Sequence, residues 1–166
     1  MVKDIIILTG ETGEGKTTSL INWMKEGEKR VHGIFMPVEE DKRFFYNPYM
    51  DIKISAEAPK STKSTDGIIE IGKFKFSKKS FKVASSWLKM KPPLNTDYLI
   101  IDEIGPLELR GDGLEPELTD FIEKTKNGEV NQTVILVVRK SLVVDVIDHY
   151  GLTNTRLIRK EDLLEL

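Results

Sequence analysis

The segment from residue 4 to residue 27 constrains the fold more than any other part of the chain. An apolar, β-branched run, Ile5 to Leu8, stops at Thr9-Gly10 and is followed by the loop GETGEGKT, residues 10–17. Apolar residues then recur at helical spacing up to Gly27, a residue type that commonly follows a helix. A G-x-x-x-x-G-K-T loop between a buried strand and a helix predicts a phosphate-binding site.

The chemistry of this loop depends on its backbone, a lysine and a hydroxyl. The glycines let successive N–H groups turn inward, and the helix N-terminus adds its dipole at the same place. Lys16 is then placed to reach the β- and γ-phosphates, and the Thr17 hydroxyl to ligate Mg²⁺. The residues predicted to bind nucleotide are Gly10, Glu11, Thr12, Gly13, Glu14, Gly15, Lys16, Thr17 and Thr18.

Two carboxylates, Glu11 and Glu14, lie in a loop that is expected to hold an anion. The cradle is made of main chain, so side chains at the variable positions are free to point outward. Two unit charges about 4 Å apart in water interact by only about 1 kcal/mol. Lys16, a bound Mg²⁺ and several inward N–H groups outweigh that repulsion, so the site is predicted to work.

A second apolar run, Tyr98 to Ile101, ends in an acidic pair. An acidic residue at the carboxyl end of a buried strand holds Mg²⁺ opposite a phosphate loop, usually through the water shell of the ion, which makes Asp102 the predicted metal residue. The alternative is an aspartate that caps a turn. Glu103 points to the other side of the strand end and is a candidate general base for the attacking water.

The arginines offer one further candidate. Arg139 ends the buried strand 133–138, which places its guanidinium at the sheet edge predicted to hold the phosphates. It either stabilises charge on the leaving group in catalysis or forms a salt bridge with a carboxylate such as Asp145. Arg43 and Arg110 lie in predicted loops and are expected to be solvated, with Arg110 the lesser catalytic candidate.

The remaining pattern alternates buried strands with amphipathic helices. Helices are predicted over 80–88, 114–125 and 141–151, the last capped by Ser141 and closed by Gly151, and strands over 133–138 and 155–159. Such alternation favours a three-layer α/β fold, with a mostly parallel sheet covered by helices on both faces and right-handed crossovers.

The segment 31–76 departs from this rhythm. It contains short strand-like runs separated by prolines and glycines, and we interpret it as antiparallel strands or a hairpin extension beside the main sheet. Its Lys/Ser/Thr stretch, 60–66, is either a mobile loop or a charged contact to phosphate. We expect this segment to be an insertion in a single domain that spans residues 1–166.

Composition narrows the function classes. Twenty-five Lys and Arg against 27 Asp and Glu give a net charge of −2, so neither nucleic acid nor a membrane is an expected partner. The absence of cysteine excludes disulfides and thiol catalysis. The first apolar run is too short for a signal peptide or membrane span, so a cytoplasmic protein is expected.

The pair GETGEGKTT and IDEIGPLEL, with a strand-rich segment between them, resembles the THEP1-type nucleoside-triphosphatases. The resemblance implies a P-loop NTPase fold with a RecA-like sheet in which an additional strand separates the phosphate-loop strand from the Asp-Glu strand. It implies hydrolysis of ATP, GTP and other triphosphates by Lys16, Thr17, Asp102 and Glu103, and it adds Glu108 by position in the motif. The chain has Pro106-Leu107 where many relatives have Lys-Met, and its middle segment matches only loosely.

These features lead to one main hypothesis and two alternatives. The main hypothesis is a Mg²⁺-dependent hydrolase that converts a nucleoside triphosphate to diphosphate and phosphate. The first alternative is a kinase that passes the γ-phosphate to a nucleotide or small molecule. The second is a nucleotide-gated interaction module in which binding reshapes the 31–76 segment.

Overall fold

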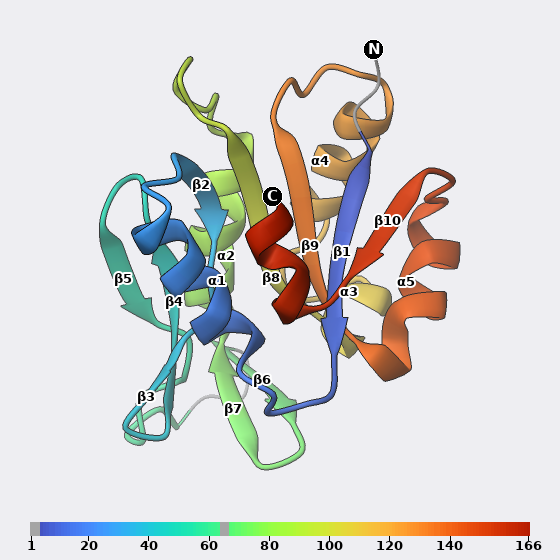
Figure 1. The fold of residues 1–166 in the computed structure, drawn as a ribbon. Helices are drawn as coiled ribbons and strands as arrows, with labels where there is room; N and C mark the ends of the chain where they lie inside the picture. Colours follow the sequence, from blue (N-terminus) through green and yellow to red (C-terminus); the bar gives the residue numbers. More distant parts are fainter. Residues whose placement is uncertain (1–3, 64–66) are drawn as a thin grey trace.

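The computed structural model describes residues 4–63 and 67–166 of the chain, and a five-stranded parallel sheet forms its centre (Figure 1). The strand order is β10-β1-β9-β8-β2. The bounds of these strands are β1 Ile5–Gly10, β2 Val31–Ile34, β8 Tyr98–Ile104, β9 Thr133–Arg139 and β10 Thr155–Ile158. Strand β9 therefore separates the phosphate-loop strand β1 from the Asp-Glu strand β8, as the resemblance implied.

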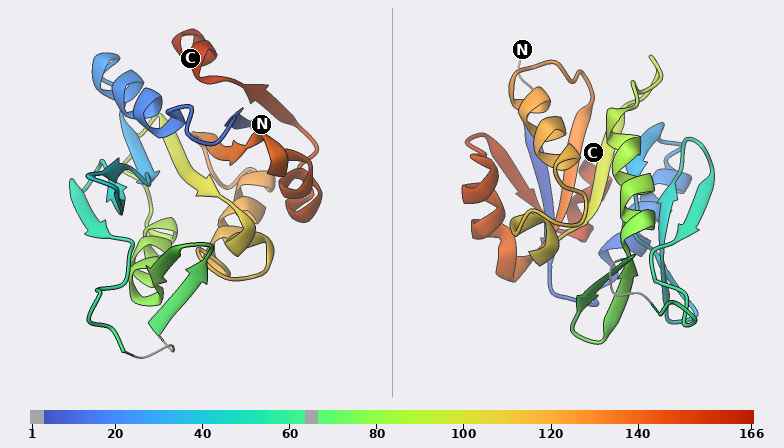
Figure 2. Two further views of the ribbon diagram at one scale, coloured as in Figure 1. Left: turned by 90° about the horizontal axis from the view of Figure 1, so that it is seen from below. Right: turned by 180° about the vertical axis from the view of Figure 1, so that it is seen from behind.

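Helices cover both faces of the sheet (Figure 2). One face carries α1 Lys16–Glu26 and the short C-terminal helix η4 Lys160–Glu165. The other face carries α2 Lys78–Ser86, α4 Glu117–Lys126 and α5 Val143–Tyr150. The short helices η2 Trp87–Lys89, α3 Pro106–Leu109 and η3 Lys140–Leu142 join these elements. The predicted three-layer α/β architecture is confirmed.

The two cores follow from the alternation of side chains along β1. Ile6 and Leu8 pack with the apolar side of α1, whereas Ile5 and Ile7 pack with the helices of the opposite face. Successive side chains of a strand point to opposite faces of the sheet, so a strand covered on both sides must be apolar throughout. The parallel strands also bring all their carboxyl ends to one edge, at the bottom of Figure 1.

The strand-rich segment forms two antiparallel units, one beside the edge strand β2 and the other at this carboxyl edge (Figure 1). They are the sheet β3 Val38–Glu39, β4 Lys42–Asn47 and β5 Ile52–Ser55, and the hairpin β6 Ile68–Ile71 and β7 Phe74–Ser77. Backbone hydrogen bonds between Phe35 and Tyr46 attach β4 to the chain just after β2. Antiparallel pairing is thus confirmed for this part of the segment.

Residues 31–34 are an exception, because they form β2, the parallel edge strand of the central sheet, and our prediction of an antiparallel extension was wrong for them. Gly33 permits this pairing. Its φ is +132°, and an added Cβ would collide with the backbone of Ile100 in β8. Only glycine combines that backbone conformation with such a close approach.

Some helix ends also differ from the predictions. Ser141 does not cap α5, because it lies inside η3 and Leu142 occupies the N-cap position. Gly151 closes α5 in the left-handed conformation, with φ 59°, as predicted. Within the stretch 60–66, residues 64–66 lie outside the described residues. The described part lies in a turn in which the Thr62 N–H donates to the Pro59 carbonyl oxygen.

Candidate nucleotide site

The phosphate loop connects the end of β1 to the start of α1 at the carboxyl edge of the sheet. Gly13 and Gly15 adopt φ values of 80° and 82°, which other residues rarely adopt. Gly15 is the N-cap residue of α1 and has no side chain to bind the first amides of the helix. The loop therefore leaves those amides to an anion.

Lys16 lies over this loop and is buried. Its Nζ donates to the carbonyl oxygens of Glu11, at 2.7 Å, and of Gly10, at 3.3 Å. Glu11 and Glu14 are both exposed, although the Glu14 carboxylate folds back against Gly10 instead of pointing away from the loop. Among the loop residues 10–18, Lys16 therefore supplies the only positively charged side chain.

Thr17 and Asp102 meet across the sheet edge, although 85 positions separate them in the sequence. The Thr17 Oγ1 donates to Asp102 Oδ2 at 2.6 Å, and the Met36 N–H donates to the same oxygen at 3.0 Å. Burial, together with the nearby charge of Glu103, raises the pKa of Asp102 from 3.8 to about 7. Asp102 Oδ1 is buried and has no hydrogen-bond partner among the described residues.

This arrangement fits a magnesium ion. Mg²⁺ prefers oxygen ligands and keeps several waters, so a protein typically supplies one or two ligands and the substrate phosphates supply others. Thr17 and Asp102 offer a hydroxyl and a carboxylate, and the unpartnered Oδ1 can accept from a water of the metal shell. The described residues hold no cluster of three or more His, Cys, Asp or Glu side chains that could bind a metal ion.

Glu103 is set apart from Asp102 by a distortion of β8. The register between β8 and β9 shifts between Ile101 and Ile104, and Glu103 has a φ of 59°. A β-bulge of this kind re-aims a side chain. Glu103 is exposed and lines a small cavity of about 30 Å³ that is also lined by Thr12, Lys16 and Arg139.

Arg139 ends β9, where it pairs in register with Gly10 of the phosphate loop. It lines the same small cavity as Lys16 and Glu103. In the part of the chain that the structure describes, Arg139 makes no ion pair, so the salt bridge with Asp145 is absent there.

A larger cavity of about 270 Å³ opens beside the small one, and the two share Thr12, Glu103 and Arg139. We call it the aromatic pocket because four phenylalanines line it: Phe45, Phe74, Phe76 and Phe81. Arg43 also lines it, although we expected this residue to be solvated in a loop. Arg43 belongs to β4 and is half-buried, with its Cζ 4.4 Å from the ring centroid of Phe74.

Glu108 is close to the site in sequence but binds backbone amides. Its Oε1 accepts from the Gly105 N–H at 3.0 Å and its Oε2 from the Leu114 N–H at 3.3 Å. Burial raises the pKa of this carboxyl from 4.5 to about 7. Glu108 therefore shapes the turn after β8. Arg110 is exposed and pairs with Asp112 at 2.9 Å, as expected of a solvated residue.

Two contacts to the site were not predicted, namely those from Met36 and Lys160. Lys160, in η4, donates from Nζ to the carbonyl oxygen of Glu14 at 2.6 Å, so the end of the chain supports the phosphate loop. Met36 binds Asp102 through its backbone N–H. Because one contact uses a main-chain donor and the other a main-chain acceptor, no motif in the sequence indicates either of them.

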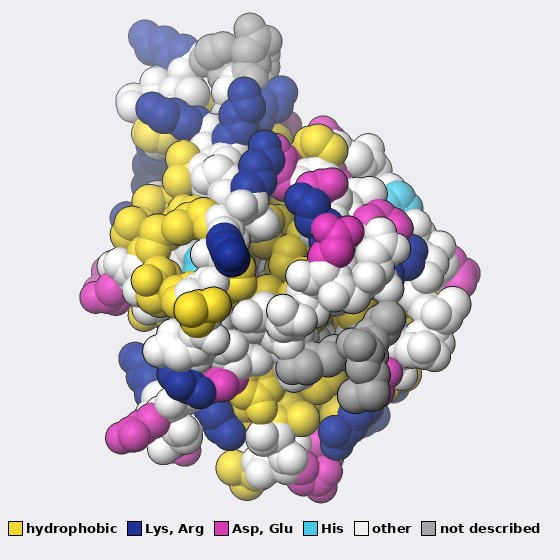
Figure 3. All heavy atoms as spheres, turned by 90° about the horizontal axis from the view of Figure 1, so that it is seen from above, with side chains coloured by type: hydrophobic (Ala, Val, Ile, Leu, Met, Phe, Trp, Pro, Cys, Tyr) yellow, Lys and Arg dark blue, Asp and Glu magenta, His cyan; other side chains and the backbone are white. Residues whose placement is uncertain are grey.

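The opposite edge of the sheet carries none of the predicted site residues. It holds a separate cavity of about 190 Å³, lined by apolar residues such as Trp87 and Phe121 and by Lys91 and Lys124. Figure 3 shows this face, where hydrophobic side chains surround a hollow and Lys and Arg side chains gather over it. Among the described residues, no helix is both long and apolar enough to cross a bilayer.

Comparisons with known proteins agree with this geometry. The family described as NTPase matches residues 5–158. The nucleoside-triphosphatase THEP1 of Saccharolobus solfataricus is 30% identical over 128 residues, which are 75% of this chain and 70% of the relative.

Two solved structures share the fold. The crystal structure of THEP1 from the hyperthermophile Aquifex aeolicus matches 98% of this chain and 95% of its own, with a TM-score of 0.69 and 23% identity. The solution structure of a human cancer-related nucleoside triphosphatase matches 98% of this chain and 94% of its own, with a TM-score of 0.63 and 16% identity. The family match and the curated relative together show that the chain belongs to the THEP1-type nucleoside-triphosphatases, enzymes with a P-loop NTPase fold.

Proposed function

We propose that the chain hydrolyses nucleoside triphosphates, ATP and GTP among them, to diphosphate and phosphate in a Mg²⁺-dependent reaction at the phosphate loop. The observation that carries this proposal is the 2.6 Å hydrogen bond between Thr17 and Asp102, beside a buried carboxylate oxygen without a partner among the described residues. A hydroxyl and a carboxylate so close to a free helix N-terminus are the components of a metal-bound polyphosphate site.

The loop and Lys16 bind and orient the substrate. The backbone N–H groups of residues 10–18 hold the phosphates, and the ammonium of Lys16 turns from the carbonyls of Gly10 and Glu11 to the β- and γ-phosphates. Thr17 and Asp102 would hold the magnesium ion. When bound, this ion neutralises charge that develops on the phosphate oxygens.

Glu103 and Arg139 act at the γ-phosphate end of the site. Glu103 accepts a proton from the attacking water, because the bulge in β8 turns it into the small cavity next to Lys16. Arg139 lines the same cavity and supplies positive charge to the transferring phosphoryl group. Glu108 serves as a positioning residue by holding the turn after β8.

The experiment that tests this proposal measures phosphate release from ATP, GTP, CTP and UTP with and without Mg²⁺. We expect release only with the metal, and a decrease of at least about 100-fold in Glu103→Gln, since general bases typically contribute 10²–10⁴-fold. Glu103→Gln should still bind the triphosphate. Equal rates with and without Mg²⁺, or full activity in Glu103→Gln, would contradict the assignment.

A further inference from the structure

The phosphate loop fixes the direction in which a bound triphosphate runs. Loop amides at the start of α1 cradle the α- and β-phosphates, whereas the lysine reaches the β- and γ-phosphates. The γ-phosphate end therefore lies at the small cavity lined by Thr12, Lys16, Glu103 and Arg139. The base lies beyond the α-phosphate, at the opposite end of the triphosphate.

The aromatic pocket begins where the γ-phosphate ends. It shares Thr12, Glu103 and Arg139 with the small cavity, so its mouth faces the transferring group and lies away from the base. Hydrolysis needs only a water molecule at this place. A cavity of about 270 Å³ is much larger than one water requires and approaches the size of a small-ligand site.

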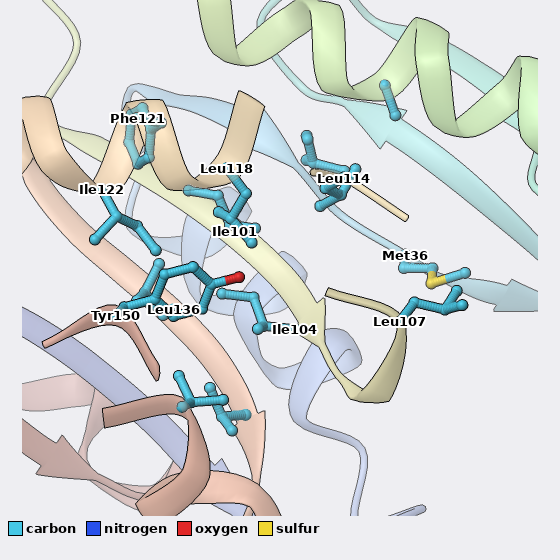
Figure 4. Packing of buried hydrophobic residues seen from close by; sticks show 14 of the residues in the cluster. Met36, Ile101, Ile104, Leu107, Leu114, Leu118, Phe121, Ile122, Leu136 and Tyr150 are labelled. Carbon is cyan, nitrogen blue, oxygen red and sulfur yellow. The ribbon is translucent and has the colours of Figure 1, made fainter. Parts of the chain in front are cut away.

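The walls of the pocket have two kinds of chemistry. Phe74 and Phe76 are stacked, with ring centroids 5.8 Å apart, and Phe76 meets Phe81 edge-on at 5.8 Å. Apolar side chains continue the wall, and Figure 4 shows Met36, just after β2, and Leu107 in α3 lying next to one another there. Such walls accept the faces and edges of a flat ring.

Two arginines, Arg43 and Arg139, also line the pocket. Arg43 is held over the face of Phe74, a cation–π contact that orients its guanidinium. Arg139 lines the pocket from the side of the phosphate loop. A planar guanidinium recognises phosphate and other oxygen acceptors with two parallel hydrogen bonds.

We propose that the aromatic pocket binds a second substrate, a nucleoside or nucleoside monophosphate, which accepts the γ-phosphoryl group in place of water. The inference rests on the proposed binding of a triphosphate at the phosphate loop. The flat base lies among the phenylalanines, and Arg43 and Arg139 bind the phosphate or hydroxyl oxygens of the acceptor.

The transfer step balances without any further reactant. An acceptor oxygen forms a bond to the γ-phosphorus while the bond from that phosphorus to the β,γ-bridging oxygen breaks. The bridging oxygen keeps the electron pair and leaves as part of the nucleoside diphosphate. When the acceptor is a hydroxyl, its proton passes to Glu103, and when it is a phosphate monoester oxygen it attacks in its ionised form.

The test follows the fate of the label from [γ-³²P]ATP with Mg²⁺, alone and with each of four nucleosides and their four 5′-monophosphates. We expect at least one of these probes to become labelled, and we expect less of the label to be released as free phosphate. Arg43→Gln should raise the KM for that acceptor at least tenfold and change the KM for ATP less than twofold. Ile71→Trp, which fills the pocket from a half-buried position, should abolish transfer.

Arg30→Gln is the matched control, because Arg30 pairs with Asp97 near the amino ends of β2 and β8, away from this pocket. It should leave the hydrolysis and the transfer unchanged. If ATP alone releases phosphate but no probe is labelled, the second substrate site is refuted while hydrolysis stands. If Arg43→Gln raises the KM for ATP instead, the pocket holds the base of the triphosphate. No phosphate release and no transfer would refute the proposed function itself.

Discussion

Replacing Glu103 by glycine should make the protein more stable and much less active. Glu103 has a left-handed φ of 59°, which costs an L-residue roughly 1–2 kcal/mol. Glycine adopts this conformation freely but gains roughly 0.5–1 kcal/mol of conformational freedom in the unfolded chain. The difference is a net gain of about 0.5–1 kcal/mol in the free energy of unfolding, since the exposed Glu103 side chain buries little surface.

Thermal and urea unfolding measure this gain, and two further variants isolate its cause. A gain of this size raises the Tm of a domain of this length by roughly 1–4 °C. Glu103→Gln also removes the charge beside Asp102 but keeps the strained backbone, so the difference between the glycine and glutamine variants reports the strain alone. Glu28→Gly is the matched control, because Glu28 is exposed and has a φ of 47° just after α1.

The expected pattern is specific. Glu103→Gly and Glu28→Gly should both gain stability, and only the variants at position 103 should lose phosphate release. If Glu103→Gly were less stable than Glu103→Gln, the left-handed backbone at this position would carry no strain and the reasoning would be wrong. If Glu28→Gly also lost activity, the loss at position 103 could not be assigned to a general base.

Four further variants test other parts of the site and sheet. Lys16→Ala should lower phosphate release about 100-fold or more, whereas Glu14→Ala should change nucleotide affinity less than tenfold, as measured by turnover and by calorimetric titration. Comparable losses in both would show that Glu14 has a direct role. Gly33→Ala should lower the free energy of unfolding by more than about 3 kcal/mol, because its Cβ meets the Ile100 backbone in β8; an unchanged urea midpoint would contradict this. Burial raises the pKa of Glu108 from 4.5 to about 7, so between these values the native state binds more protons than the unfolded state and stability falls as pH rises. Glu108→Gln should remove that part of the pH dependence, on the order of 3 kcal/mol, and a slope equal to that of the wild type in urea titrations would refute this.

The sequence predicted those parts of the fold in which one local signal sufficed. The buried runs at 5–8, 98–101 and 133–138 read as strands because they are apolar throughout and end at turn or polar residues. The loop at 10–17 carries its own pattern, and Asp102 lies near the end of a strand that had to finish at the same edge of the sheet. Their convergence on one site follows from parallel topology.

Other features depend on contacts between distant segments, which no local pattern records. The run VHGI at 31–34 resembles the antiparallel strands that follow it, and its place beside β8 depends on a close approach that only Gly33 allows. Arg43 could not be distinguished from a solvated arginine until the fold brought it into contact with the ring of Phe74, a residue of a different sheet. The bulge at Glu103 is a shift in register between β8 and β9, two strands that are distant in the sequence. The catalytic and metal-binding roles of the site residues remain predictions, as does the assignment of residues 1–166 to a single domain.

The place of β1 in the sheet determines when, during synthesis of the chain, the phosphate loop can take up its folded position. Ile5 pairs with Val134 on one side and with Thr155 on the other, so both neighbours of the strand that leads into the phosphate loop come from the last third of the chain. Long-range pairing of this kind forms slowly, because a large loop must close first. Residues 133–158 must therefore leave the ribosome before β1, which is made earlier, has both of the neighbouring strands that hold the phosphate loop in place.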